Sequence, residues 1–477
     1  MLDTLHDAWT ALLAIPHLGL YLTLGWALYL IGLGGWIVLQ KREPVATISW
    51  LLGLALLPYL GFIIYHWLGP QRIVRQRLRR ARSRATLPTP AALRDDATAL
   101  ELARIGQTTT GLAPATATVA RLLIDGGAKY TALLADIASA RESIHLEYYI
   151  FYPDRTGTAL RDALVERARA GVQVRLLLDA VGSGKTKQRF LQPLVDAGGE
   201  IAWFHPMRLR WFWKRPWLNL RSHRKLVIID DRIGYTGGIN ITDDEDERLR
   251  ADAYRDLHLR LQGDVVRTLQ LVFVEDWAYS TGAPPHLPPP PASTPGPIAA
   301  QALTSGPDSS WEAIHRLHVG AIHSAQRRVW LATPYFVPGE AAMMALTSAA
   351  LGGLDVRLLV PKLSDSRVVT YAARSYFDDL LAAGVKVYEY GPRLLHTKAL
   401  LVDDDLALIG SANFDHRSFR LNFELSMLFR DTGIAAELAR LIEGEFTLAP
   451  RVHPGRDRPL WRARLPEALA RLVSPLL

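Results

Sequence analysis

The sequence predicts an α/β fold with two similar repeats packed about a pseudo-twofold axis, a candidate active site between them and an N-terminal transmembrane helical hairpin. Three observations predict this fold. One polar signature occurs twice, with its histidines His223 and His396 lying 173 residues apart. Short apolar strands alternate with helical segments in both halves, and two long uncharged runs precede them. The chain of 477 residues is long enough for two domains after the hairpin.

Two apolar runs near the N-terminus predict the hairpin, within residues 1–70. Residues 8–40 contain no Asp, Glu, Lys or Arg, and a second uncharged run follows the charged loop at 41–43. A membrane-spanning helix needs about 20 apolar residues, so both runs are long enough. The predicted spans are residues 18–40 and 45–68. A cleaved signal peptide fits the first run poorly, because Asp3 and Asp7 precede its apolar part and no basic start is present.

A basic segment follows the hairpin, within a predicted juxtamembrane linker over residues 71–110. It holds seven arginines, against two basic residues in the connecting loop. The seven are Arg72, Arg75, Arg77, Arg79, Arg80, Arg82 and Arg84. The positive-inside rule therefore places the remainder of the chain in the cytoplasm. Such a run can be a solvated helix face or can bind anionic headgroups.

The overall composition favours one charge class of binding partner but does not identify the partner. The net charge of +8 and the pI of about 9.6 favour anionic partners, whether lipid, phosphate or nucleic acid. The chain contains no cysteine, which excludes a disulfide framework and thiol chemistry.

The two repeats are predicted over residues 111–283 and 301–477, separated by a Pro-rich linker over 284–300. Residues 171–178 and 353–360 have similar apolar sequences that read as equivalent strands. Helical segments are expected before such strands, at residues 131–141 and 370–383. The alternation of helix and strand predicts layered α/β structure in each repeat.

The repeated signature is His-x-Lys-x4-Asp-x6-Gly-(Gly/Ser)-x-Asn. Its first copy is His223, Lys225, Asp230, Gly237, Gly238 and Asn240. Its second copy is His396, Lys398, Asp403, Gly410, Ser411 and Asn413. A lone histidine is more often structural than catalytic, but two complete copies at identical spacing favour function. The apolar runs at residues 226–229 and 399–402 predict strands buried on both faces.

The residue types in the signature suit phosphoryl transfer. Side chains two apart on a strand share a face, so each histidine points with its lysine. Two half-sites facing each other bring together two proton-exchanging imidazoles, two cations and two amide donors. One histidine can attack phosphorus while the other protonates the leaving oxygen. Asn240 and Asn413, with the lysines, then stabilise the phosphoryl oxygens.

Two parts of this interpretation have alternatives. Asp230 and Asp403 belong to the signature and are candidates for the catalytic set, but their offset of seven residues from the histidines favours a turn. A metal site is the weaker alternative, because each His-x-Lys pair places an ammonium beside any bound cation and no zinc-ligand spacing is nearby. No metal and no cofactor are therefore expected.

The doubled signature resembles that of the phospholipase D superfamily. The resemblance extends along the chain to its bacterial cardiolipin synthase branch, through residues 41–52, 144–151, 365–377, 413–424 and 458–477. It implies metal-independent transfer through a phosphohistidine, with His223 as nucleophile and His396 as general acid and then base. The reverse assignment stays open. The family also has an acid that orients each histidine, a role that falls on Asp256 in the first half and Glu424 in the second; an ordinary strand-end carboxylate is the alternative.

The resemblance implies a bacterial inner-membrane enzyme that joins two phosphatidylglycerol molecules into cardiolipin and releases glycerol. A hydrolase that releases phosphatidic acid by the same chemistry is the alternative. Two complete signatures argue against a catalytically idle lipid-binding or nucleic-acid-binding protein, and the hairpin disfavours a nuclease. The first half carries about 13 extra residues before His223, in the basic, aromatic stretch 206–217. This insertion suits a membrane interface, with a packed lid or single-stranded nucleic acid binding as alternatives.

Overall fold

The computed structural model describes residues 16–39, 44–57, 60–61, 65, 97–206, 220–287, 291–309 and 311–474. The chain divides into two units that separate after Gln71, and each is described by itself. Three sequence-based predictions lie outside the described residues: the charged loop at 41–43, the arginine run at 72–84 and nearly all of the insertion at 206–217.

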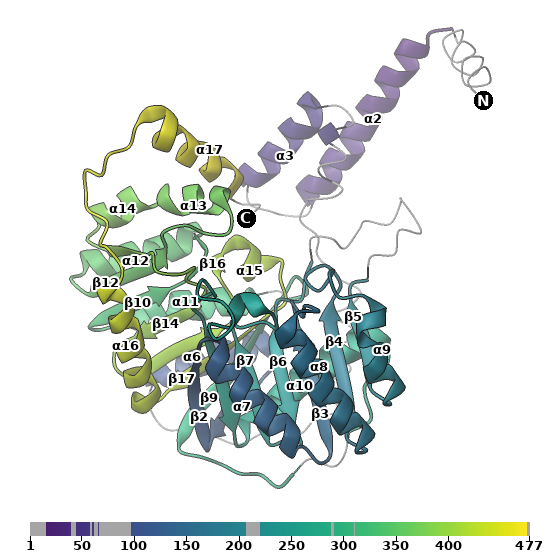
Figure 1. The fold of residues 1–477 in the computed structure, drawn as a ribbon. Coiled ribbons are helices and arrows are strands. Elements are labelled where there is room, and N and C mark those ends of the chain that lie inside the picture. The colour runs from purple at the N-terminus through teal and green to yellow at the C-terminus, as the bar shows by residue number, and fades with distance from the viewer. Residues whose placement is uncertain are drawn as a thin grey trace. The chain divides into compact units, whose positions relative to one another are not determined.

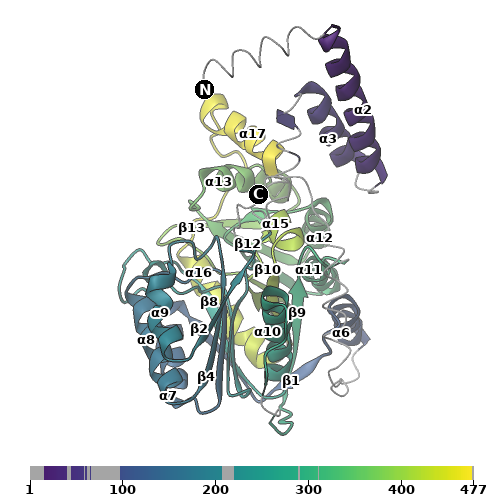
Figure 2. The same cartoon turned by 90° about the vertical axis from the view of Figure 1, so that its right-hand side faces the viewer.

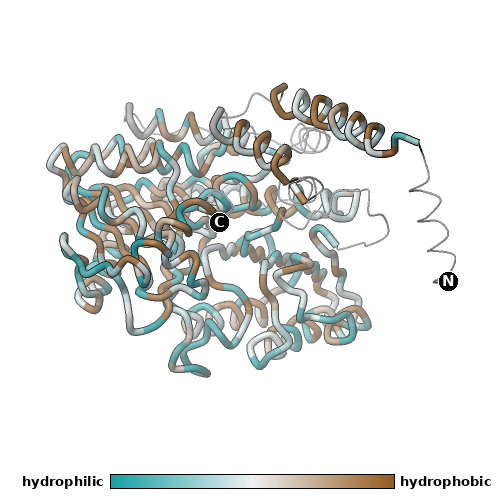
Figure 3. Tube along the Cα trace, turned by 90° about the horizontal axis from the view of Figure 1, so that it is seen from above, coloured by the Kyte–Doolittle hydropathy of each residue, from teal (hydrophilic) through white to brown (hydrophobic). Residues whose placement is uncertain are grey.

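The N-terminal unit contains the predicted apolar helices. Helix α2 (Leu18–Leu39) carries no charged residue, and Figure 3 shows it in brown and white along most of its length. Among the described residues it is the one helix long and apolar enough to cross a membrane, judged by length and composition. Helix α3 (Pro44–Leu56) is shorter, and the remainder of the predicted second span is only partly described. Ile37 of α2 and Leu54 of α3 share one small buried cluster with Tyr65.

The second unit is built on two large sheets with the same strand order (Figures 1 and 2). The first has the order β2 (Val119–Ile124), β8 (Leu257–Gln262), β7 (Ile233–Gly237), β6 (Lys225–Ile229), β3 (Ser143–Tyr148), β4 (Gln173–Asp179) and β5 (Glu200–Phe204). The second has the order β1 (Ala115–Ala117), β9 (Ile298–Ser305), β17 (Glu424–Arg430), β15 (Leu406–Gly410), β14 (Ala399–Val402), β10 (Arg328–Ala332), β12 (Asp355–Pro361) and β13 (Lys386–Tyr390).

From β2 and β9 onward the sheets correspond strand by strand, which confirms the predicted pair of repeats. In both, the last three strands run parallel and the others are antiparallel. Strand β1 breaks the symmetry, because it precedes the first repeat in the chain yet pairs with β9 of the second sheet. A separate two-stranded sheet joins β11 (Phe336–Val337) to β16 (Phe414–Asp415).

The main core lies between the two sheets. Leu226 and Ile228 of β6 share one buried cluster with Leu401 of β14 and Ile409 of β15. The alternate β6 residue Val227 points into a second cluster under the outer helices of the first repeat. The signature strands are therefore buried on both faces, as their continuous apolar runs predict. Each such side chain stabilises the fold by about 1.5–3 kcal/mol through removal from water.

Helices cover the outer faces of the sheets. In the first repeat these are α7 (Asp125–Ser139), α8 (Arg155–Arg169) and α9 (Gln188–Asp196). In the second repeat they are α11 (Ala313–Ser324), α12 (Glu340–Leu351), α13 (Arg367–Arg374) and α14 (Phe377–Ala382). Residues of α10 (Val265–Thr281) and α16 (Thr432–Thr447) join the core between the sheets. A short 3-10 turn, η2 (Asp243–Glu245), follows the first signature, and η3 (Leu460–Arg464) leads into the final helix α17 (Leu465–Val473).

The structure differs from the expected element boundaries at three places. Helix α6 (Ala97–Thr110) occupies the end of the predicted linker, where the Gln301 amide donates to the Ala103 carbonyl oxygen at 3.1 Å. Strand β9 begins at Ile298, inside the predicted Pro-rich linker. The helix expected over residues 370–383 is two helices, α13 and α14, interrupted at Ser375 and Tyr376.

Candidate active site

Both signature histidines lie where the two repeats touch. His223 precedes β6, and its backbone N–H donates to the Phe423 carbonyl oxygen at 2.9 Å. His396 precedes β14, and its N–H donates to the Arg255 carbonyl oxygen at 2.7 Å. Phe423 comes directly before Glu424, as Arg255 comes directly before Asp256. Two short parallel bridges thus place each histidine beside the acid-bearing segment of the other repeat.

The carboxylates are consequently exchanged between the repeats. The Nδ1 atom of His223 lies 3.0 and 3.1 Å from the two carboxylate oxygens of Glu424. The Nδ1 atom of His396 lies 2.5 Å from an oxygen of Asp256. The expectation that each half supplies the acid for its own histidine is therefore wrong. Both predicted acids contact a signature histidine, each in the other repeat, and their role in orienting it stays a prediction.

The two lysines lie beside these pairs and are buried. Lys225 donates from Nζ to the His223 carbonyl oxygen at 2.7 Å. The Nζ atom of Lys398 lies 3.4 Å from Asp256 and also donates to the His396 carbonyl oxygen. Burial lowers the pKa of Lys225 to about 7, with the charge of Lys398 acting in the same direction and Glu424 opposing it. The pKa of Lys398 is also lowered by burial, against the attraction of Asp256.

The ionisation of the first pair favours a neutral imidazole. Burial lowers the pKa of His223 to about 4, although the Glu424 carboxylate opposes that shift. Burial alone raises the pKa of Glu424, but the contacts with His223 and Lys225 outweigh it and leave the pKa lowered. With Glu424 ionised, Nδ1 of His223 must donate the proton of that hydrogen bond. Its Nε2 atom then carries a lone pair at neutral pH.

The second pair holds a short, charge-assisted contact. Burial raises the pKa of Asp256, but Lys398 and His396 outweigh that effect and lower it overall. The carboxylate of Asp256 is therefore ionised beside the His396 ring and the Lys398 ammonium. The two histidines therefore have different surroundings although their signatures match.

The two signatures also differ at the position after their shared glycine, which is Gly238 in the first repeat and Ser411 in the second. Ser411 donates from Oγ to Glu424 at 2.5 Å and accepts from the Leu425 N–H at 3.0 Å. In the first repeat Asp256 accepts the corresponding Leu257 N–H itself, at 2.7 Å. A Cβ atom at Gly238 would lie 2.2 Å from an Asp256 oxygen. The shorter acid folds back over the signature turn, so only glycine fits there.

The asparagines are held unequally. The Asn240 amide donates to Glu245 at 2.7 Å and accepts from the Ile150 N–H at 3.2 Å. Asn413 instead makes a backbone contact, at 3.2 Å, to the Ser418 hydroxyl. Among the described residues, the buried side-chain oxygen of Asn413 has no hydrogen-bond partner. The Asn413 side chain thus has fewer hydrogen bonds to the protein than that of Asn240. The phosphate-binding role of both residues stays a prediction.

Asp230 and Asp403 are placed away from this cluster. Asp230 follows the far end of β6, and its carboxylate accepts the N–H groups of residues 141–143 at 2.8–2.9 Å. Asp403 accepts those of residues 326–328 at 2.8–3.0 Å. Strand β6, with five residues, and strand β14, with four, lie between these carboxylates and the histidine ends, about 13–17 Å. Both carboxylates anchor turns away from the histidines, and their inclusion in the catalytic set stays a prediction.

Three residues near the site were missed by sequence reasoning. Glu245 is buried against Asn240, five residues later in the chain, where the second repeat has Ser418. The ring of Tyr149 lies 4.9 Å from that of His223, and Tyr254 lies 5.5 Å from His396. Comparison of the two repeats could have found Glu245. Tyr149, just after β3, and Tyr254, just before β8, gave no comparable signal.

One set of these groups has the arrangement of a metal site. Single ligand atoms of Glu245, Asp256 and His396 lie within 4.8 Å of one another. The Lys398 ammonium is 3.4 Å from Asp256 and supplies a positive charge at the same position. The Lys398 ammonium therefore already compensates negative charge of these carboxylates.

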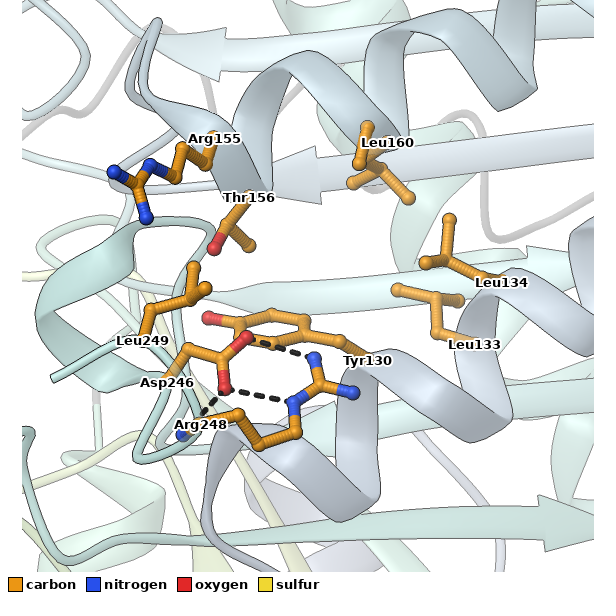
Figure 4. A pocket seen from close by; sticks show the side chains of 10 residues that line it. Tyr130, Leu133, Leu134, Arg155, Thr156, Leu160, Asp246, Arg248 and Leu249 are labelled. Atoms are coloured by element: carbon orange, nitrogen blue, oxygen red, sulfur yellow. Dashed lines mark hydrogen bonds and ion pairs between the residues drawn. The ribbon is translucent and has the colours of Figure 1, made fainter.

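A pocket of about 230 Å³ lies elsewhere in the first repeat, between α7, α8 and the segment after η2 (Figure 4). Leu133, Leu160 and Leu249 form much of its wall, and Arg248 is paired with Asp246 at its rim. No signature residue lines it. One lining residue connects the pocket to the site: the Tyr130 hydroxyl donates to the Asn240 carbonyl oxygen at 2.7 Å.

Comparison with known proteins identifies the family. A family model described as "Cardiolipin synthase, PLD-like domain" matches residues 133–249 and 319–446, and one described as "Phospholipase_D-nuclease N-terminal" matches residues 27–70. A cardiolipin synthase of Geobacillus kaustophilus is 41% identical over 465 residues, which cover 92% of this chain and 91% of that protein. A protein named cardiolipin synthase 2 from Bacillus anthracis is 39% identical over 92% of this chain and 88% of its own length.

Among solved structures, a phosphatidylserine synthase of Haemophilus influenzae matches with a TM-score of 0.60 and 15% identity. The match covers 79% of this chain and 100% of that one, and it supports the fold alone. The matched family segments contain both signatures and cover both repeats. The chain therefore belongs to the cardiolipin synthases, a family of phosphatidyltransferases within the phospholipase D superfamily.

Proposed function

We propose that this protein transfers a phosphatidyl group between two phosphatidylglycerol molecules, giving cardiolipin and glycerol through a covalent phosphohistidine. The observation that carries the proposal is the pair of exchanged histidine–carboxylate contacts around two buried lysines. Two proton-exchanging imidazoles beside two cations suit a reaction that builds charge on a phosphoryl group. Relatives named cardiolipin synthase, similar over 92% of the chain, support the substrate class.

In the first step, Nε2 of His223 attacks phosphorus of the donor lipid. A P–N bond forms, the P–O bond to the departing glycerol breaks, and His396 gives its proton to the glycerol oxygen. The neutral state favoured by the lowered pKa of His223 supports this assignment. Glu424 holds the attacking ring by its Nδ1 atom and stabilises the charge that develops on it.

In the second step, the terminal hydroxyl of the acceptor lipid attacks the same phosphorus. His396 accepts the hydroxyl proton, a new P–O bond forms, and the P–N bond breaks to restore His223. Asp256 is suited to stabilise His396 each time it carries a proton, since it lies 2.5 Å from Nδ1. Lys225, Lys398 and Asn413 are proposed to stabilise the phosphoryl oxygens.

We further propose a multi-pass arrangement in the bacterial cell membrane, with the two repeats in the cytoplasm. The uncharged runs over residues 18–40 and 45–68 support two spans, and the arginines at 72–84 support the orientation. Residues 1–70, 111–283 and 301–477 are proposed as the hairpin and the two repeats. Anchoring beside the bilayer lets both lipid substrates reach the site without leaving the membrane.

Product analysis tests the reaction. The purified full-length protein is incubated with phosphatidylglycerol vesicles in the presence of a chelator, and products are followed by mass spectrometry. Cardiolipin and glycerol in equal amounts are expected. Phosphatidic acid as the main product would show a hydrolase of the same mechanism, and loss of activity with the chelator would show a metal requirement. Either result overturns part of the proposal.

A further inference from the structure

The final helix, α17, has the reverse of the usual arrangement of a surface helix. Its buried positions are Glu467, Ala470 and Ser474 at the helix end. Its outward positions Leu465, Leu469, Leu472 and Val473 follow the i, i+4, i+7 spacing of one helix face. Leu469 is 54% exposed and Leu472 is 77% exposed. The helix directs leucines to the outside and a carboxylate to the inside.

Polar contacts hold α17 in this orientation. Glu467 accepts from Arg458 at 2.5 Å and lies 3.4 Å from Arg456. At its end, the Ser474 hydroxyl is 3.2 Å from the Tyr376 hydroxyl. Because buried ion pairs and hydrogen bonds select one geometry, rotation of the leucines inward would leave Glu467 unpaired. The outward apolar face is therefore set by the fold.

The segment just before α17 adds an aromatic ring and positive charge. In η3, Leu460 and Trp461 are exposed, Trp461 by 77%. Arg462 and Arg464 follow them and are exposed, and neither forms an ion pair with any residue that the structure describes. Exposed leucine, tryptophan and arginine in one segment are typical of an interfacial membrane helix.

Helix α17 lies on the second repeat. Helix α17 packs on α13, where Arg471 donates to the Ser375 carbonyl oxygen at 3.1 Å (Figures 1 and 2). Just before α13, Asp365 accepts from Tyr335 at 2.7 Å. Burial raises the pKa of Tyr254 to about 12, with the nearby charges of Asp244 and Asp365 acting in the same direction, and its ring centroid lies 5.5 Å from that of His396. Helix α17 thus packs on the helix that follows the Asp365 segment, and Asp365 lies near enough to Tyr254, beside His396, to act on its charge.

We propose that the outward face of η3 and α17, meaning Leu460, Trp461, Leu465, Leu469, Leu472 and Val473, inserts into the surface of an anionic phospholipid bilayer. The leucines enter the acyl boundary, Trp461 lies at headgroup depth, and Arg462 and Arg464 bind lipid phosphates. A second copy of the chain is the less suitable partner, because the same arginines would face each other across a two-fold axis. The inference rests on the proposed function only for the lipid class.

The depth of this face in the bilayer can be measured directly with spin labels. Because the chain contains no cysteine, a single introduced cysteine carries the only label. Single cysteines at Leu469 or Leu472 of the full-length protein are labelled with a nitroxide in phosphatidylglycerol vesicles. Val119 is the matched control: it is exposed and apolar, but it pairs with Gln262 at the end of β2 away from Asp256. We expect both α17 labels to be protected from a water-soluble nickel chelate by about tenfold relative to the control, and to be accessible to oxygen.

Two results would overturn the proposal. Labels on α17 as accessible to the chelate as the control would show a face in water. Labels shielded from both reagents, with spin–spin broadening between copies, would show a second chain on that face. Production of phosphatidic acid would refute the proposed function and leave the depth profile unchanged, so the two failures can be told apart.

Introducing charges of either sign on this face gives a functional measurement. The double variant Leu469→Glu/Leu472→Glu is expected to lose at least about fivefold in turnover on phosphatidylglycerol vesicles, and Leu469→Lys/Leu472→Lys less, because cations keep the attraction to anionic lipid. Turnover of a short-chain, water-soluble phosphatidylglycerol is expected to stay within about twofold in both variants, since the lipid surface contributes nothing there. Equal loss on both substrates in both variants would indicate a folding defect and contradict the proposal.

Discussion

The two repeats have the same strand order and the same signature, yet their histidines differ in surroundings. His223 faces the longer acid Glu424, which is also held by Ser411, and its pKa is lowered to about 4. His396 faces the shorter acid Asp256, which is also paired with Lys398. A duplicated backbone thus supports two different chemical environments, and the differences reside in the acids and in the residues beside the signature. The lowered pKa of His223 is the observation on which we propose that the nucleophile lies in the first repeat.

The largest expected effect separates the roles of the histidines. His223→Ala and His396→Ala should each lower phosphatidylglycerol turnover by at least about 10⁴-fold, because each step needs both groups. A donor lipid with a p-nitrophenol leaving group needs no proton on departure. On that donor, His396→Ala should retain a burst of p-nitrophenol and His223→Ala should not. A burst in the reverse pattern would exchange the two assignments.

The exchanged acids come next in size. Glu424→Gln should slow the p-nitrophenol burst by about 10²-fold, because the ring of His223 loses the carboxylate that orients it. Asp256→Asn should spare the burst and slow transfer to the acceptor by a similar factor. If each acid served its own repeat, the two variants would show the opposite assignment, so stopped-flow burst measurements decide between the arrangements.

The glycine and serine of the signature provide a smaller, asymmetric test. Gly238→Ser should displace Asp256, because a Cβ atom there would lie 2.2 Å from its carboxylate, and transfer to the acceptor should fall about tenfold or more. Ser411→Gly leaves the buried Leu425 N–H without its acceptor and should cost about 1–3 kcal/mol of stability. Thermal inactivation and burst kinetics measure the two effects. Equal behaviour of the variants would contradict the different packing of the two turns.

The pH profile examines the lysine of the first repeat. Burial lowers the pKa of Lys225 to about 7, so in the free enzyme its charged form is present below that pH and is lost above it. We expect kcat/KM to fall as pH rises through about 7, and to fall on the acid side as His223 gains a proton near pH 4. Measurements use vesicles of constant composition, so that surface potential does not change. A flat kcat/KM between pH 6 and 9 would contradict the proposed need for a charged Lys225.

The smallest effect on chemistry is expected at the turn carboxylates. Asp230→Asn and Asp403→Asn each weaken backbone hydrogen bonds at the far ends of β6 and β14, and should cost about 1–3 kcal/mol of stability. Turnover of the folded protein should change by less than about threefold. Inactivation temperatures and kcat for both variants provide the check. A loss of kcat comparable to that of a histidine variant would support their inclusion in the catalytic set.

Much of this architecture could be predicted from local sequence. The strands β6 and β14 follow from their apolar runs, helix α2 coincides with a continuous uncharged stretch, and the doubled signature predicts two equivalent sheets. These features depend on neighbouring residues or on a repeat within the chain, so one sequence suffices.

The exchange of acids could not be predicted, because it depends on two bridges between residues about 140 and 200 positions apart in the chain. Nothing near His223 indicates that Glu424 lies beside it. The same is true of β1, whose three residues join the sheet of the other repeat. The turn role of Asp230 was foreseen as an alternative, since its offset from His223 was odd, but only its three amide contacts decide it.

The central claim is that the two repeats divide the chemistry, with the covalent intermediate on the first. The most direct test traps that intermediate in the His396→Ala variant, with a donor lipid that carries p-nitrophenol and a labelled phosphate. After denaturation at alkaline pH, where phosphohistidine is stable, peptide mapping locates the label. The account predicts one phosphatidyl group per chain on the peptide that contains His223, and none in a His223→Ala/His396→Ala double variant. Label on any other residue, or a burst without bound label, would contradict it.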